Sequence, residues 1–127
     1  MNEEQSRLAR LTGKVLAAAF RVSNVLGSGF VERVYENSLV MELREAGFGV
    51  LQQPAVEVLY RGRVVGQYVA DLIVEGAVVV EVKAISSLET SHEAQCMNYL
   101  RATKLKVCLL LNFGRPRIQY RRIVWGI

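Results

Sequence analysis

Cysteine and histidine are scarce in this chain, and their scarcity removes several kinds of functional site. Cys96 and Cys108 are the only cysteines and His92 is the only histidine among 127 residues. The two cysteines have neither the spacing of a metal site nor the density of a disulfide scaffold, so we expect two reduced thiols in the core. The sequence also lacks a Cys-x-x-Cys pair, a Walker loop and a nucleophile elbow.

Long hydrophobic runs are absent as well. No segment approaches the ~18 consecutive apolar residues that a membrane helix needs. The start, MNEEQSR, has acid where a signal peptide has base, so we expect a cytoplasmic protein with no membrane contact. Hydrophobic residues make up 51% and charged residues 22%, as in soluble globular proteins. At 127 residues the chain can bury one core and is too short for two, which predicts a single domain over residues 1–127.

Acidic residues are missing from the last quarter of the chain. The net charge is +4 with a pI of about 9.3, a mild excess that suits a nucleic-acid partner without requiring one. All 12 acidic residues lie at or before Glu93, and these basic residues follow: Arg101, Lys104, Lys106, Arg115, Arg117, Arg121 and Arg122. They fit a phosphate-binding surface, and they fit equally well a set of solvated helix and edge-strand positions.

Apolar periodicity predicts three helices. Over residues 3–26 apolar side chains recur at alternating spacings of three and four, which is typical of a helix lying on a sheet and also fits a coiled-coil seam. A second helix is expected over about residues 30–46, because a glycine follows that can close it. Thr90 and Glu93 have the spacing of a capping box, which predicts a third helix over about residues 90–103.

Strand-like segments separate and follow these helices. They cover about residues 50–61, 64–74, 77–85, 106–113 and 117–124. The first three segments follow one another through short turns and are expected to form a meander. The order is helix, helix, three strands, helix, two strands (ααβββαββ). It predicts an α/β or α+β fold with a central mixed β-sheet flanked by helices.

The segment VVVEVKAI, residues 78–85, places two charges inside a strand that is expected to be buried on both faces. Side chains alternate along a strand, so Glu81 and Lys83 point to one face and Val82 points to the other. An ionised group buried without compensation is costly, and such positions normally lie beside a counter-charge, a metal or a water-filled cleft.

Asp71 lies near the end of the preceding strand, where a hairpin through Gly76 can bring it beside Glu81. Two neighbouring carboxylates raise the pKa of one of them unless a cation lies between them, and Mg²⁺ prefers such small oxygen clusters. A helical projection also puts Glu32 on the apolar side of the second helix, although a solvated glutamate at a helix N-terminus explains it equally well.

The third helix carries a polar stripe. His92, Gln95 and Tyr99 fall at spacings of three and four. The stripe either belongs to a core face whose hydrogen bonds are satisfied internally or faces a cleft beside the preceding strand. The sequence leaves both interpretations open.

Several short motifs occur in order along the chain. Gly29, Glu32 and Tyr35 spell GxxExxY, and they are followed by ADLIVE (70–75), VEVKA (80–84), HEAQxxNYL (92–100) and LLLNFG (109–114). With these motifs the chain resembles the GxxExxY proteins, which are grouped with the PD-(D/E)XK nuclease superfamily. The resemblance runs from about residue 12 to about residue 124, and it implies a restriction-endonuclease-like core.

The resemblance implies a role for each matched residue. Asp71 and Glu81 would be the metal-binding acids, with the Val82 carbonyl as a backbone ligand. Glu32 would be the helical acid that completes the metal site. Lys83 would orient or activate the attacking water.

The polar stripe of the third helix takes part in the same resemblance. Gln95 with Tyr99 is similar to the Gln-x3-Tyr pattern of recombination-type exonucleases, where the glutamine lies near the metal or the scissile phosphate. Ala70 replaces the superfamily's nominal proline, at a variable position. The candidate catalytic residues are therefore Asp71, Glu81, Lys83 and Gln95, and the candidate substrate contacts are Tyr35, His92, Tyr99, Arg117 and Arg121.

The resemblance implies a metal-dependent nuclease that hydrolyses phosphodiester bonds, with DNA as the expected nucleic-acid partner. Mg²⁺ or Mn²⁺ would polarise the phosphoryl oxygen and acidify a bound water. One alternative is a nucleic-acid-binding or adaptor module that does not cut. Another is a homodimeric structural protein in which Glu81 and Lys83 pair with each other and with the basic C-terminal strand. A homodimer could use the seam on the first helix or the last strand.

Overall fold

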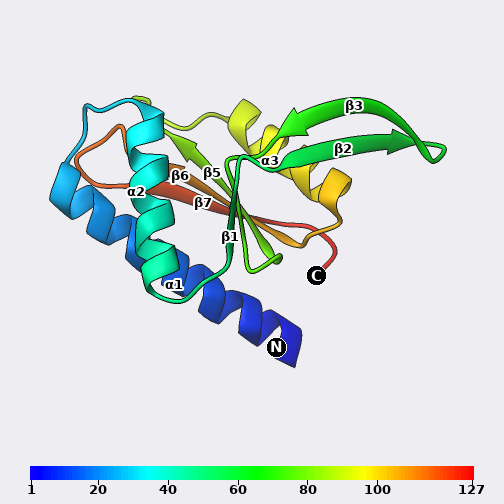
Figure 1. The fold of residues 1–127 in the computed structure, drawn as a ribbon, viewed down its shortest axis with the longest axis horizontal. Helices are drawn as coiled ribbons and strands as arrows, with labels where there is room; N and C mark the ends of the chain where they lie inside the picture. The colour runs from blue at the N-terminus through cyan, green and yellow to red at the C-terminus, as the bar shows by residue number, and fades with distance from the viewer.

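The computed structural model describes residues 1–127 and contains a mixed sheet of five strands with helices on both faces (Figure 1). A separate two-stranded ribbon projects from this body. The elements are α1 (Glu3–Leu26), α2 (Glu32–Glu45), β1 (Val50–Gln52), β2 (Ala55–Tyr60), β3 (Arg63–Val69), β4 (Leu72–Val74), β5 (Val78–Lys83), α3 (Thr90–Thr103), β6 (Val107–Asn112) and β7 (Gln119–Val124).

The sheet has the strand order β1-β4-β5-β6-β7. Strands β5 and β6 are parallel and are connected through α3, whereas the other neighbours are antiparallel. The first five residues of β5 are buried, as expected for a strand covered on both faces. Val78, Val80 and Val82 belong to the core under α1 and α2, and Val79 belongs to the core under α3. The predicted α+β class with a mixed sheet is confirmed.

Helices α1 and α2 cover one face of the sheet. The apolar stripe of α1 is buried against the protein's own sheet at Leu8, Val15, Ala18 and Val22. The alternative in which this stripe is a coiled-coil or dimer seam is therefore wrong, because burial of each large side chain already stabilises the monomer by about 1.5–3 kcal/mol. Neither α1 nor any other helix is long and apolar enough to cross a membrane.

Helix α3 covers the opposite face and packs on β5, β6 and β7. Its buried side chains Cys96, Tyr99 and Leu100 form a second core with sheet residues that include Cys108 and Leu110. Both cysteines are free and buried, which confirms the prediction of two reduced core thiols.

The strands predicted over 50–61 and 64–74 are each broken in two, so seven strands form instead of five. Gln53 adopts a left-handed backbone with φ of 56°, and the proline that follows has no N–H to donate to a sheet. Ala70 and Asp71 make the matching break in the other strand, where Ala70 N–H donates to Pro54 O at 3.1 Å. As a result β1 and β4 stay in the main sheet, whereas β2 and β3 form the projecting ribbon (Figure 1).

Candidate active site

Asp71 and Glu81 lie side by side where β4 and β5 meet. The backbone N–H of Asp71 donates to Glu81 Oε1 at 3.0 Å, and the N–H of Val82 donates to Asp71 Oδ2 at 2.7 Å. This reciprocal arrangement follows from the register of the antiparallel strands, which pairs Leu72 with Val80. The residue before Leu72 is Asp71 and the residue after Val80 is Glu81, so the two acids lie opposite each other. The expected juxtaposition of the two carboxylates is confirmed.

The two carboxylates resist ionisation. Burial, followed by the charge of Asp71, raises the pKa of Glu81 to about 8. Burial also raises the pKa of Asp71, and the charge of Glu36 adds to the effect. The positive charge of Lys83 lowers both pKa values by less than burial raises them. The pair therefore lacks enough positive charge to hold both groups ionised.

Lys83 ends β5 on the same face as Glu81 and is half-buried. None of the three ion pairs in the molecule includes it, so no carboxylate lies within 4.0 Å of its ammonium group. The alternative in which Glu81 and Lys83 form a structural salt bridge is therefore wrong. The ammonium group remains free to donate hydrogen bonds at the site.

The backbone of Val82 faces the same place. Its N–H donates to Asp71, and the N–H and C=O of one strand residue point toward the same edge. The carbonyl of Val82 therefore faces the Asp71 side of β5, where the resemblance requires a backbone ligand.

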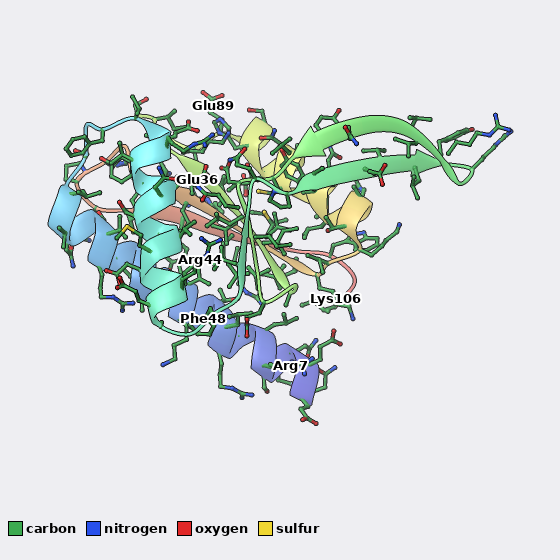
Figure 2. All side chains as sticks on the ribbon, in the orientation of Figure 1. Arg7, Glu36, Arg44, Phe48, Glu89 and Lys106 are labelled. Carbon is green, nitrogen blue, oxygen red and sulfur yellow. The ribbon has the colours of Figure 1, made fainter.

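Glu36 is a site residue that the sequence did not reveal. It lies on α2 (Figure 2) and is 3% exposed. Gln53 Nε2 donates to Glu36 Oε1 at 2.9 Å and to Asp71 Oδ1 at 3.2 Å, so one amide joins the two acids. Gln52 Nε2 also donates to Glu36 Oε2, at 2.7 Å. The available signal was the stripe that Glu36 shares with Val40 and Leu43, at helical spacings of four and three.

Glu32, the helical acid expected in the metal site, is exposed. It occupies the first turn of α2 beside Val31 and Arg33, which are exposed as well. It borders a hollow of about 560 Å³ that is also lined by Glu36, Gln53 and Asp71. Of the two interpretations of Glu32, the structure shows the solvated glutamate at a helix N-terminus, at the rim of this hollow. Glu36 is the buried acid of α2.

The loop after β5 is fixed by Asn112, which is fully buried. Asn112 Oδ1 accepts from the N–H of Ile85 at 3.0 Å, and Asn112 Nδ2 donates to the carbonyl of Ile85 at 3.0 Å. Gln119 Oε1 accepts from Asn112 Nδ2 and from the N–H of Leu88, at 3.2 and 2.9 Å. A Cβ at Gly114 would overlap the backbone of Ile85, so only glycine fits there. These contacts hold the segment next to Lys83 and were not predicted.

The polar stripe of α3 is divided between different environments. Tyr99 donates to the carbonyl of Val69 at 3.0 Å. Burial, with the charges of Glu81 and Asp71, raises its pKa to about 12, as expected for a hydroxyl near the acid pair. Gln95 is exposed and lines a different hollow, between α3 and the β2–β3 ribbon, with Tyr99. Gln95 is therefore not brought to the Glu36–Gln53–Asp71 hollow.

His92 has a local structural contact. Its Nδ1 accepts from the N–H of Glu89 at 2.9 Å, at the start of α3. The helix is therefore capped by Glu89 and His92, and the expected capping box of Thr90 and Glu93 is wrong.

Tyr35 lies in the core behind the site. Its ring stacks on Phe113 at a centroid distance of 4.8 Å, and its side chain is completely buried. Its hydroxyl donates to Gly27 O at 2.6 Å and accepts from Phe30 N–H at 3.2 Å. These contacts place Tyr35 as the residue that holds the α1–α2 loop. The remaining candidate substrate contacts, Arg117 and Arg121, are exposed at β7 and its approach.

The donor set at the site suits a hard divalent cation. No group of three or more histidine, cysteine, aspartate or glutamate side chains is gathered as a complete metal centre, so the predicted set of Glu32, Asp71 and Glu81 is not assembled. Mg²⁺, however, is commonly bound by one or two carboxylates together with water and substrate phosphates. Asp71 and Glu81, with pKa values raised first by burial and then by neighbouring negative charge, meet that requirement.

Comparison with known proteins identifies the family. A family model described as the PD-(D/E)XK nuclease superfamily matches residues 9–123. The chain belongs to the PD-(D/E)XK nuclease superfamily. No curated protein matches the chain significantly.

A solved structure supports the same fold. The crystal structure of SSO0001 is similar with a TM-score of 0.60 and 20% sequence identity, over 76% of this chain and 51% of that one. The chain thus spans about half the length of that structure. The predicted restriction-endonuclease-like core is confirmed, and the PD-(D/E)XK nuclease superfamily is typically metal-dependent.

Proposed function

We propose that this chain is a metal-dependent nuclease that hydrolyses phosphodiester bonds, with DNA as substrate, and that it belongs among the GxxExxY proteins. The observation that carries the proposal is the buried pair of Asp71 and Glu81. The two residues are interlocked through backbone hydrogen bonds, and both have raised pKa values beside a lysine that no acid neutralises. A buried pair of carboxylates destabilises a fold unless a cation or another partner compensates its negative charge.

Asp71, Glu81 and the carbonyl of Val82 would hold Mg²⁺ or Mn²⁺. When bound, the ion would neutralise the acid pair, stabilise charge on the phosphate and lower the pKa of a water molecule. Glu36 helps to position Asp71 indirectly, because it accepts a hydrogen bond from Gln53, which also donates to Asp71 Oδ1. The N–H of Val82 holds the other oxygen, Oδ2, of the Asp71 carboxylate.

Lys83 supplies a positive charge that no acid neutralises. Its ammonium group lies on the face of Glu81 with no acid within 4.0 Å, so it can donate to the attacking water or to a phosphate oxygen. Asn112 and Gln119 keep the following loop from moving, which orients the end of β5. The hollow beside Asp71 is where the scissile phosphate would enter.

The second candidate is a nucleic-acid-binding or adaptor module that does not cut. It is favoured by the excess of positive charge, because phosphate contacts alone explain exposed cations. The raised pKa values at the acid pair favour the enzyme, since a binding module gains nothing from two buried carboxylates that resist ionisation.

A cleavage assay with matched variants separates the two. Single- and double-stranded DNA and RNA of one sequence are incubated with EDTA, Mg²⁺ or Mn²⁺ and the wild type, Asp71→Asn, Lys83→Met or Glu57→Gln. Glu57 is an exposed acid on β2 and serves as the control. We expect metal-dependent cleavage that falls by about 100-fold or more in Asp71→Asn and Lys83→Met and is unchanged in Glu57→Gln.

Two outcomes would reject the nuclease. Equal cleavage by wild type, Asp71→Asn and Lys83→Met would show that the activity comes from a contaminant. Salt-sensitive binding without turnover in any metal or substrate would support the binding module instead.

A further inference from the structure

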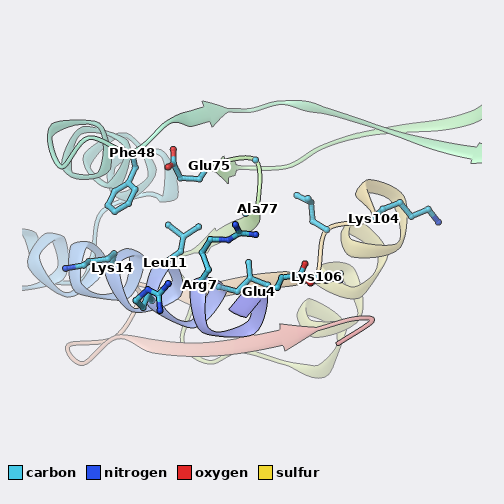
Figure 3. A pocket seen from close by; sticks show the side chains of 13 residues that line it. Glu4, Arg7, Leu11, Lys14, Phe48, Glu75, Ala77, Lys104 and Lys106 are labelled. Atoms are coloured by element: carbon cyan, nitrogen blue, oxygen red, sulfur yellow. Dashed lines mark hydrogen bonds and ion pairs between the residues drawn. The ribbon is translucent and has the colours of Figure 1, made fainter. Parts of the chain in front are cut away.

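A second hollow has a volume of about 730 Å³ (Figure 3). We call it the basic groove. It borders Ala77, just before β5, whereas Glu81 lies toward the far end of that strand. Its walls come from the first half of α1, the turn at residues 75–77 between β4 and β5, and residues 104–106 between α3 and β6. Its floor is apolar and includes Leu8, Leu11 and Phe48. None of its lining residues lines the hollow beside Asp71.

Positive charge in the basic groove exceeds negative charge. The cations that line it are Arg7, Arg10, Lys14, Lys104 and Lys106. Its two acids already have partners, because Glu4 Oε2 pairs with Lys106 Nζ at 3.2 Å and Glu75 Oε2 accepts from the N–H of Gly49 at 2.7 Å. No ion pair in the molecule includes the other four cations.

The cations come from α1 and from residues 104–106. Arg7, Arg10 and Lys14 follow one another on α1 at spacings of three and four, so they form a stripe of about 10 Å along the helix axis. Lys106 and Lys104 lie beyond the N-terminal end of this stripe, where Lys106 contacts Glu4 of α1 (Figure 3). A series of cations beside apolar side chains suits a chain of phosphates whose bases contact the apolar side chains.

We propose that the basic groove binds a single strand of nucleic acid at a point remote from the cut. The proposal rests on the proposed nuclease function, because the substrate of that reaction is a polyanion. Ala77 borders the groove and Lys83 lies six residues further along, so the two places are about 20 Å apart along β5. A strand that occupies both must therefore be several nucleotides long. The groove raises the affinity for long strands and does not act on the reacting phosphate.

Fluorescence anisotropy in EDTA tests this binding without cleavage. The probe is a labelled single-stranded DNA of about 30 nucleotides, titrated between about 50 and about 200 mM NaCl. The wild type is compared with Arg10→Gln/Lys14→Gln in the groove and with Arg61→Gln/Arg63→Gln at the tip of the β2–β3 ribbon, which removes equal charge elsewhere. Melting curves confirm that each variant is folded.

We expect the groove variant to bind at least about fivefold more weakly at low salt, and the control to bind like the wild type. The slope of log Kd against log salt should fall by about 1.4, because each single-strand phosphate contact contributes about 0.7. Equal weakening in both variants would overturn the proposal, since it would show only a general charge effect. Displacement of the DNA by an equal concentration of polyglutamate would also overturn it, in favour of an acidic protein partner.

Cleavage in Mg²⁺ separates this proposal from the nuclease itself. A substrate of about three nucleotides is too short to span the roughly 20 Å between the two places, so the groove variant should cut it like the wild type and should cut the long strand more slowly. If wild type cleaves neither substrate, the proposed nuclease fails, and the groove is judged by the binding data alone. Equal cleavage of the long strand by groove variant and wild type at limiting DNA would contradict the groove.

Discussion

Glu81→Gln is expected to stabilise the metal-free protein at neutral and alkaline pH, although it removes a charge from the candidate site. Burial, then the charge of Asp71, raises the pKa of Glu81 from 4.5 to about 8. Between these pH values the folded protein holds a proton that the unfolded chain releases. The folded state binds more protons, so the free energy of unfolding falls as the pH rises through this window.

The magnitude follows from the raised pKa. Each pH unit between about 5 and about 8 is expected to lower the free energy of unfolding by about 1.4 kcal/mol, which accumulates to about 4 kcal/mol. This is a large share of the 5–15 kcal/mol that is typical of a whole domain. In the Glu81→Gln variant the side-chain amide oxygen can still accept from the N–H of Asp71, which lies 3.0 Å from Glu81 Oε1, and the new side chain carries no charge to titrate.

Urea unfolding in EDTA at pH 5, 6, 7 and 8 measures the effect. The stability of Glu81→Gln relative to wild type should grow with pH, from less than about 1 kcal/mol at pH 5 to about 4 kcal/mol at pH 8. Glu57→Gln, at an exposed position on β2, should show no such trend. A pH-independent difference between Glu81→Gln and wild type would refute the reasoning, because Glu81 would then be ionised like an exposed acid.

Three further substitutions test how the site is held in place. Gly114→Ala should lower the free energy of unfolding by about 1–3 kcal/mol, because its Cβ would overlap the backbone of Ile85. Gly13→Ala, in open space on α1, should instead stabilise the protein slightly. Equal effects of the two substitutions in urea unfolding would contradict this reasoning. Tyr99→Phe should cost about 1–2 kcal/mol by leaving the Val69 carbonyl unpaired, and an unchanged urea midpoint would argue against that bond. Asn112→Ala should speed hydrogen exchange at the Ile85 amide, and unaltered protection there would show that Asn112 does not fix the loop.

The pairing of Asp71 with Glu81 could be predicted because it depends on local rules. Side chains alternate along a strand, and one short turn joins the two strands that carry the acids. The break at Gln53 could not be predicted in the same way. Glutamine has no preference for a positive φ, so the residue that divides the long strand and joins Glu36 to Asp71 carries no local signal.

The remaining parts of the site depend on distant segments. A helical projection fixes the direction of each side chain of α2, but only tertiary packing decides which turn lies over the sheet, and Glu36 is buried where Glu32 is exposed. The Asn112 contacts require the parallel register of β5 and β6, whose residues are far apart in the sequence. The basic groove likewise joins Arg7, Arg10 and Lys14 to Lys104 and Lys106, which lie near the other end of the chain.

Proton release on metal binding tests the central claim most directly, because it reports on the acid pair itself. Mn²⁺ is titrated calorimetrically at pH 7 in two buffers of different ionisation enthalpy, into wild type, Glu81→Gln and Asp71→Asn. A pKa of about 8 means that Glu81 is mostly protonated at this pH, so wild type should release close to one proton per ion bound. Glu81→Gln should bind more weakly and release almost none, and Asp71→Asn should lose most of the binding. Binding without proton release, or equal release from Glu81→Gln, would contradict a metal site at this acid pair.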